Sequence, residues 1–228
     1  MNIQGFQKLT LLDFPQHTAC TVFTGGCNLR CPFCHNASLV RTPKPPTVSE
    51  DEIFTYLERR RGILDGVCIT GGEPLLQPDL IPFLLKVKEM GYLVKLDTNG
   101  MLPKRLAAVL AAGAVDYVAM DVKSSPAGYA KATGGAEDVT PFEESMKLLR
   151  ESGVSYEFRT TAVKGIHTVE DFSAIARWLR PDDPYFVQQF VDSGELLGEG
   201  CTAFSPEEMR EILSAVQEHL PHASLRGV

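Results

Sequence analysis

The amino-acid sequence predicts an α/β fold, an open partial (β/α)6 barrel of the TIM type. Short runs of β-branched and apolar residues alternate with helix-like segments along the chain, a pattern typical of βαβ units with a parallel sheet. Six such units are fewer than the eight of a closed barrel. A doubly wound sheet is the alternative, and both architectures place chemically active side chains at the carboxyl ends of the strands. The length of 228 residues and the 44% hydrophobic content predict one domain over 1–228.

Six apolar runs supply the core strands, and a short seventh run lies near the end of the chain. The core of strands and helices is expected to span 19–191, preceded by an N-terminal extension (1–18) and followed by a C-terminal helix and short strand (192–228). The predicted strands are 19–25, 66–72, 92–98, 115–122, 155–163, 185–191 and 223–227.

Capping residues predict where the helices between these strands begin. Three segments have a Ser or Thr followed three residues later by Glu, the pattern of a capping box, and two of them carry proline at the first helical position. These segments start at Ser49, Thr140 and Ser205. Pro103 and Thr168 are expected to open two more helices, and a further helix over 79–90 is closed by Gly91.

Composition and charge exclude several classes of protein. The formal net charge is −7 and the longest basic run is Arg59–Arg61, which argues against nucleic-acid binding. No run approaches ~20 apolar residues, so no membrane-spanning helix is expected. The first residues lack the pattern of a signal peptide. We therefore predict a cytoplasmic protein whose six cysteines are kept reduced, which disfavours disulfides.

Three cysteines, Cys27, Cys31 and Cys34, share one short segment and are followed by His35. A structural zinc site wants four ligands in two separated pairs, and His35 is too close to Cys34 to complete the tetrahedron. Cys31 to His35 also matches the C-x-x-C-H pattern of c-type haem attachment, but that reading leaves Cys27 unused. Three thiolates with C-x3-C-x2-C spacing favour a [4Fe–4S] cluster in which three irons have protein ligands and the fourth is open to a small molecule.

The cysteine segment, together with a second motif, resembles the radical S-adenosylmethionine (SAM) enzymes. Phe33, just before the third cysteine, matches the aromatic residue that lies near the adenine of SAM in that family. Gly71-Gly72-Glu73-Pro74, at the end of the second predicted strand, matches the GGEP motif. The resemblance implies that Gly71, Gly72 and Glu73 hold the methionyl ammonium, a role that suits a carboxylate and carbonyl oxygens. On its own, GGEP can also be a turn that ends a strand.

Two aspartate motifs resemble those of the glycyl-radical-enzyme activating enzymes. Asp97-Thr98-Asn99-Gly100 and Asp121-Val122-Lys123 end the third and fourth predicted strands, where either aspartate alone is read as a turn cap. The resemblance implies a monovalent cation, whose oxygen ligands are Asp97, Thr98, Asp121 and the Val122 carbonyl. It also implies SAM contacts from Asp97, Asn99, Lys123 and Arg159. A salt bridge at the barrel rim is the alternative for Arg159.

The resemblance extends over the whole chain, to the activating proteins of anaerobic ribonucleoside-triphosphate reductase. Cys34-His35-Asn36 matches their CHN motif and implies that His35 and Asn36 lie near the substrate glycine. The activating enzymes of pyruvate formate-lyase carry a histidine on the sixth strand that contacts SAM. This chain has Gln189 in that region, and the resemblance implies that Gln189 takes over the contact. The implied partners are a glycyl radical enzyme, namely that reductase, and a flavodoxin- or ferredoxin-type electron donor.

Two other functions remain open from the sequence. The first is a radical SAM enzyme that acts on a small molecule, similar to 7-carboxy-7-deazaguanine synthase. The second is a non-enzymatic electron carrier or zinc module. Ferredoxin-type carriers use four cysteines per cluster, so three cysteines followed by GGEP favour an enzyme.

Overall fold

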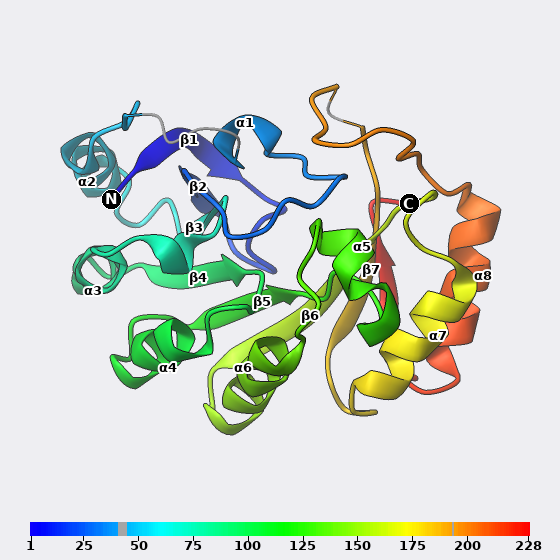
Figure 1. Ribbon diagram of the computed structural model, residues 1–228. Coiled ribbons are helices and arrows are strands. Elements are labelled where there is room, and N and C mark those ends of the chain that lie inside the picture. The colour runs from blue at the N-terminus through cyan, green and yellow to red at the C-terminus, as the bar shows by residue number, and fades with distance from the viewer. Residues whose placement is uncertain (41–44, 193) are drawn as a thin grey trace. The chain divides into compact units, whose positions relative to one another are not determined.

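A computed structural model describes residues 1–40, 45–192 and 194–228 as an α/β protein (Figure 1). The strands are β1 (Ile3–Thr10), β2 (Ala19–Thr24), β3 (Gly66–Gly71), β4 (Leu93–Thr98), β5 (Tyr117–Asp121), β6 (Ser155–Ala162), β7 (Tyr185–Gln189) and β8 (Ser224–Arg226). The helices are α1 (Ala37–Val40), α2 (Glu50–Arg59), α3 (Leu80–Glu89), α4 (Pro103–Ala111), α5 (Tyr129–Thr133), α6 (Thr140–Glu151), α7 (Val169–Trp178) and α8 (Pro206–Gln217). Two 3-10 turns, η1 (Pro74–Leu76) and η2 (Pro126–Gly128), complete the set.

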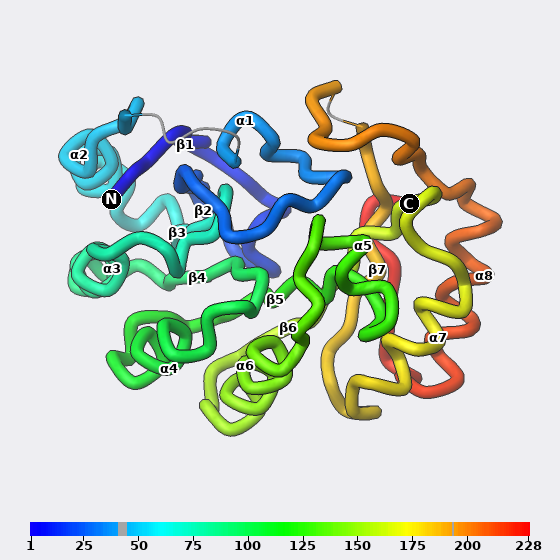
Figure 2. Tube along the Cα trace, viewed as in Figure 1, coloured from blue at the N-terminus to red at the C-terminus, as the bar shows by residue number. Residues whose placement is uncertain are grey.

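The chain divides into two compact units, each made of three separate stretches of the sequence. The colours of Figure 2 help to follow these stretches by residue number. The first unit comprises Met1–Asn28, Ser38–Ala119 and Pro141–Ser155. The second comprises Leu29–Ala37, Met120–Thr140 and Tyr156–Val228. Strand β5 contributes residues to both units.

The first unit is built on strands β1 to β4. Strand β1 is antiparallel to β2, and β2, β3 and β4 pair in parallel, with Val22 opposite Ile69 and Ile69 opposite Leu96. These three side chains are fully buried, which explains why their β-branched and apolar runs form strands. Helices α2, α3 and α4 cover this sheet with apolar faces (Figure 1). Strand β1 is an addition to the prediction, which gave residues 1–18 as an extension.

The second unit contains the parallel strands β6, β7 and β8. Helices α7 and α8 pack against each other, and each begins with a complete capping box, at Thr168 and Ser205. The short strand β8 is held by Arg226, whose guanidinium makes two bonds of 2.6 and 2.7 Å to the carboxylate of Glu157 on β6. The Glu157 side chain is fully buried, so this pair compensates a charge inside the unit.

The order of the strands confirms the predicted fold class. Along the sheet, the strands follow one another in chain order from β1 to β8. A doubly wound sheet reverses its order at a switch point, whereas a barrel-like sheet adds each new strand on the same side. The sheet is therefore the open, partial barrel type, with an additional strand at each end of the six predicted core strands.

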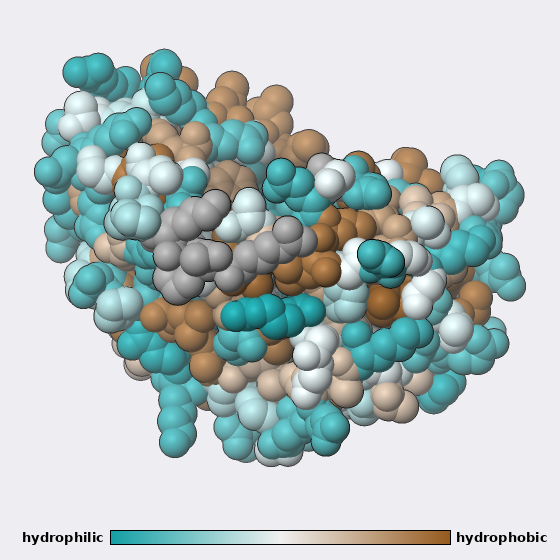
Figure 3. All heavy atoms as spheres, turned by 45° about the horizontal axis from the view of Figure 1, so that its top comes forward, coloured by the Kyte–Doolittle hydropathy of each residue, from teal (hydrophilic) through white to brown (hydrophobic). Residues whose placement is uncertain are grey.

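The surface is mixed in character. In Figure 3, hydrophilic residues in teal alternate with patches of hydrophobic residues in brown. No helix of the described residues is long and apolar enough to cross a membrane. Exposed leucines gather where β1 ends and the connection to β2 begins, at Leu9, Leu11 and Leu12.

Candidate functional site

The GGEP turn lies directly against the chain segment that leads to Cys27. The Gly72 amide donates to the Thr24 carbonyl at 2.8 Å, and the Glu73 amide donates to the Gly26 carbonyl, also at 2.8 Å. A β-carbon on Gly72 would lie 1.9 Å from the Gly26 oxygen, so only glycine allows the two backbones to approach this closely. Backbone contact therefore fixes the first part of the cysteine segment on the turn.

The carboxylate of Glu73 links this turn to the residues that follow β4. Its Oε1 accepts hydrogen bonds from the Leu75 amide at 3.0 Å and the Thr98 hydroxyl at 2.9 Å. Its Oε2 accepts from the Asn99 amide at 2.8 Å. The side chain is fully buried, so these bonds give Glu73 a positioning role, while its contact with a SAM ammonium stays a prediction.

The side chain of Asn99 reaches the cysteine segment within the first unit. Its Nδ2 donates to Asn28 Oδ1 at 2.8 Å and points to the Cys27 sulfur at 3.8 Å. Its Oδ1 accepts from the Met101 amide at 3.0 Å, which fixes the rotamer. The structure thus brings Cys27, Glu73 and Asn99 into one hydrogen-bonded group, to which Asn28 is an addition that no motif indicated.

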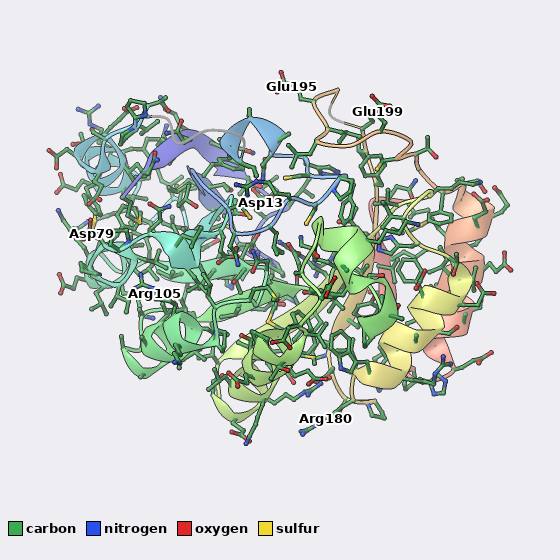
Figure 4. All side chains as sticks on the ribbon, in the orientation of Figure 1. Asp13, Asp79, Arg105, Arg180, Glu195 and Glu199 are labelled. Atoms are coloured by element: carbon green, nitrogen blue, oxygen red, sulfur yellow. The ribbon has the colours of Figure 1, made fainter. Side chains whose placement is uncertain are left out.

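A second connection holds the turn after β3 in place. Arg105 on α4, labelled in Figure 4, donates to the backbone carbonyls of Leu75 and Gln77 in and after η1. The side-chain Nε2 of Gln77 in turn donates to the Gly25 carbonyl at 2.9 Å. Charged and amide donors thus satisfy carbonyl groups around the GGEP turn and stiffen it.

Asp97 lies on β4 beside a buried lysine. The carboxylate forms an ion pair with the ammonium of Lys95, two residues earlier on the same strand. Lys95 is 1% exposed and Asp97 is 8% exposed. The same ammonium lies 3.8 Å from the sulfur of Cys68 on β3. No sequence motif singled out Lys95.

In the second unit, Asp121, Lys123 and Arg159 form one charged network. Asp121 Oδ2 accepts from Lys123 Nζ at 2.8 Å, and Oδ1 accepts from Arg159 Nε at 2.6 Å. Burial acts against both charged forms, yet the opposite charges hold the pKa of Asp121 below and that of Lys123 above the ordinary value of each. The alternative reading of Arg159 as a partner in a salt bridge is confirmed, while its contact with SAM stays a prediction.

Backbone contacts fix the second part of the cysteine segment, which belongs to the second unit. The Arg30 amide donates to the Thr133 carbonyl at 2.9 Å, and the Pro32 carbonyl accepts from the Gly198 amide at 2.8 Å. Beside Thr133, Gly134 has φ +74°, and a β-carbon there would lie 2.3 Å from the Arg30 oxygen. The segment is therefore supported from both α5 and the connection after β7.

Cys31 and Cys34 lie close to the charged network of the same unit. The Cys34 amide donates to the Cys31 carbonyl at 3.1 Å, which closes a tight turn. Burial raises the pKa of the Cys34 thiol, and the ammonium of Lys123 acts in the opposite direction. The charge of Lys123 therefore offsets part of the burial that keeps the Cys34 thiol protonated.

His167 is a functional candidate that the sequence did not reveal. Its Nδ1 accepts from the Val163 amide at 3.1 Å, so its Nε2 carries the proton and donates to the Lys123 carbonyl at 2.8 Å. Its ring packs edge-on against Phe33, with 5.9 Å between the ring centroids. Burial lowers the pKa of His167. His167 therefore positions both Lys123 and Phe33 as a neutral imidazole.

His35 and Gln189 are two further site candidates in the second unit. The His35 ring lies 5.3 Å from that of Phe190 between centroids, and burial lowers its pKa, an effect that Lys123 reinforces. Gln189 Nε2 donates to the Phe204 carbonyl at 2.9 Å, but its buried Oε1 has no hydrogen-bond partner among the described residues. An unsatisfied buried acceptor fits a ligand that brings a donor.

The cysteines carry the donor chemistry for an iron–sulfur cluster, but no complete metal cage is formed by the described residues. All six cysteines are thiols. Among the residues that the structure describes, no group of three or more His, Cys, Asp or Glu side chains is arranged to hold a metal ion. Cys27 belongs to the first unit, whereas Cys31 and Cys34 belong to the second.

Comparison with known proteins identifies the family. The model of the radical SAM superfamily matches residues 21–179, and the chain belongs to this superfamily. It is therefore an enzyme of the radical SAM class, and the family implies a [4Fe–4S] cluster and SAM. The residues of this chain fit both groups in chemistry, through three thiols on one segment and the buried acceptor of Gln189.

Individual relatives narrow the comparison. A candidate glycyl-radical enzyme activating enzyme of Methanocaldococcus jannaschii is 30% identical over 233 residues, which cover 99% of this chain and 96% of that protein. The pyruvate formate-lyase-activating enzyme of Clostridium pasteurianum is 30% identical over 71% of this chain and 68% of that protein. A solved radical SAM methyltransferase from Sphaerobacter thermophilus shares the fold, with a TM-score of 0.73 and 15% identity over 96% of this chain and 68% of that chain.

Proposed function

We propose that this radical SAM enzyme activates a glycyl radical enzyme. The observation that carries the proposal is the similarity to a candidate activating enzyme along 99% of the chain. It is supported by the hydrogen bonds that join Glu73 and Asn99 of the two motifs and attach Asn99 to the segment of Cys27. The partner that we propose is anaerobic ribonucleoside-triphosphate reductase, with a flavodoxin- or ferredoxin-type electron donor in the cytoplasm.

In this proposal, Cys27, Cys31 and Cys34 hold three irons of the cluster and leave the fourth open for SAM. When bound, the cluster and SAM would together supply the chemistry of the reaction, which is reductive cleavage of a carbon–sulfur bond of SAM followed by abstraction of a hydrogen atom. The side chains and backbone proposed to bind and orient SAM are those of Phe33, Gly71, Gly72, Glu73, Asp97, Asn99, Lys123, Arg159 and Gln189.

Specific contacts support several of these assignments. His167 holds the ring of Phe33, which suits a residue that defines one edge of the adenine site. Lys123 and Arg159 keep their positive charges beside Asp121 and suit the SAM carboxylate. Gln189 offers a buried acceptor oxygen. These side chains are already fixed by neighbours, so binding SAM costs little further ordering.

His35 and Asn36 are proposed to face the substrate glycine. Burial and the charge of Lys123 lower the pKa of His35, which favours its neutral form, and the ring lies 5.3 Å from that of Phe190 between centroids. A neutral ring suits a surface that receives a peptide loop, because no charge needs to be desolvated when the loop docks.

Electron paramagnetic resonance tests the proposal directly. The reconstituted protein, SAM, a reductant and anaerobic ribonucleoside-triphosphate reductase are mixed under anoxia, and a glycyl radical doublet is expected. The doublet is lost in Cys31→Ala and persists in the matched control Cys201→Ala. Cleavage of SAM without a radical on this reductase would refute the reductase as the partner. If no candidate glycyl radical enzyme gains a radical, the activating role is refuted and the small-molecule alternative is left. Zinc in place of iron after reconstitution would refute both.

A further inference from the structure

Strand β4 carries two oppositely charged side chains on one face. Side chains two residues apart on a strand point to the same side, which places Lys95 next to Asp97. Lys95 is 1% exposed, and in the parallel register of β3 and β4 it lies opposite Cys68. Its ammonium pairs with the Asp97 carboxylate and points to the Cys68 sulfur at 3.8 Å. A lysine is rarely buried this deeply unless it is paired.

The two cation ligands expected in the first unit already have protein partners. Asp97 is neutralised by Lys95. The Thr98 hydroxyl donates to Glu73 Oε1 at 2.9 Å, and its oxygen accepts from the Gly100 amide at 3.2 Å. A metal cation at Asp97 would therefore lie beside an ammonium of the same charge, in surroundings from which most water is excluded.

The two cation ligands expected in the second unit are also engaged. Asp121 pairs with Lys123 and Arg159. The Val122 carbonyl accepts from the Thr160 hydroxyl at 2.8 Å. Side-chain cations thus compensate the aspartate in each unit, and the residues present do not fit the monovalent cation that the sequence resemblance implied.

We infer that Lys95 is a built-in counter-ion that replaces an exogenous monovalent cation at Asp97. The ammonium holds the Asp97 carboxylate in place and supplies the positive charge, so the folded chain gains nothing from sodium or potassium at this position. Lys95 is a positioning residue that acts through Asp97. The inference rests on the proposed function only where it assigns Asp97 to the SAM site.

The first test needs neither cluster nor SAM. Thermal unfolding of the cluster-free chain is followed in choline, lithium, sodium or potassium chloride at one ionic strength. The midpoint is expected to stay within about 1 °C across the four salts, because Lys95 already compensates Asp97. A saturable rise in the midpoint that is specific to sodium or potassium would overturn the inference.

Substitution of Lys95 by methionine should create the requirement that the native chain lacks. In Lys95→Met, the midpoint in choline chloride falls and potassium or sodium restores part of it. The matched control is Lys88→Met, which removes an ammonium paired with Asp116 at 2.5 Å in the same unit, with both side chains about 30% exposed. A Lys95→Met chain that responds to all four salts as Lys88→Met does would overturn the inference.

A second variant covers the case in which Lys95→Met does not fold. The double variant of Lys95→Met with Asp97→Asn removes both charges, so it is expected to fold and to show no preference among the salts. A sodium- or potassium-specific rise in the midpoint of this variant would place the cation at another site and overturn the inference.

SAM affinity provides the functional readout. In the reconstituted holoenzyme, the dissociation constant of SAM is expected to change less than about twofold when potassium chloride replaces choline chloride, and more than about tenfold in Lys95→Met. A native affinity that requires potassium would overturn the inference. If the holoenzyme binds no SAM, the proposed function fails, and the salt dependence of the midpoint still decides the role of Lys95.

Discussion

The substitution Glu73→Gln tests whether the GGEP turn and the residues after β4 are held together as the structure indicates. A carboxylate accepts hydrogen bonds through both oxygens, whereas a carboxamide accepts through one and donates through its nitrogen. The best orientation of Gln keeps its oxygen on the Leu75 amide and the Thr98 hydroxyl. Its nitrogen then faces the Asn99 amide, which in the native chain donates to Oε2 at 2.8 Å.

The expected cost follows from this one lost interaction. A hydrogen bond to a charged group contributes about 1.5–3 kcal/mol, and the buried donor is left unsatisfied. The local opening free energy at Asn99 should fall by this amount, so the exchange rate of its amide hydrogen should rise by roughly 10- to 150-fold. Hydrogen exchange of the cluster-free chain, read residue by residue, measures this rate.

The control is Glu58→Gln on an exposed position of α2, which should leave the exchange of Asn99 unchanged. The reasoning is refuted if Glu73→Gln also leaves that exchange unchanged. If Glu73→Gln leaves the exchange of Asn99 unchanged but abolishes SAM binding in the reconstituted enzyme, Glu73 acts through direct contact with the cofactor. It then does not act by positioning the turn.

Three further outcomes are expected for residues of the second unit, the first of them measured against a glycine of the first unit. Gly134→Ala should lower the free energy of unfolding by about 1–3 kcal/mol more than Gly153→Ala, because both have positive φ but only the first would place a β-carbon against backbone; thermal denaturation compares the two variants. Arg226→Met should cost about 3 kcal/mol in urea denaturation, because the fully buried Glu157 loses its charge partner, and a loss below about 1 kcal/mol would contradict this. The native chain should lose stability as the pH falls below 6.5, because the lowered pKa of His167 makes the unfolded chain bind more protons. Stability measured from pH 8 to pH 5 should decline less in His167→Gln, and an equal decline would contradict the assignment.

Most of the fold could be predicted because local signals and tertiary packing agree. The apolar runs form strands, and the helix starts predicted at Thr168 and Ser205 are the N-caps of α7 and α8. Strand β1 was missed because its sequence IQGFQKLT mixes polar residues and glycine, and its residues bury no continuous apolar face. The side chains of an edge strand are only partly buried, so such a strand leaves a weak hydrophobic pattern.

The site was predicted in part for a similar reason. Motifs at the ends of parallel strands could be expected to meet, as Glu73 and Asn99 do within the first unit. Lys95 could not be found, because β4 is buried on both faces from Val94 onward and a lysine in a strand is normally read as exposed. His167 also carried no signal, since its two hydrogen bonds go to backbone groups.

The pairing of Glu157 with Arg226 also limits when the second unit can fold during synthesis of the chain. The two residues are 69 positions apart, and ribosomes add about 5–20 residues per second, so roughly 3–14 s separate their synthesis. During that interval the carboxylate that ends inside the second unit still needs water. The second unit therefore completes its folding only after the strand that carries Arg226 has emerged from the ribosome.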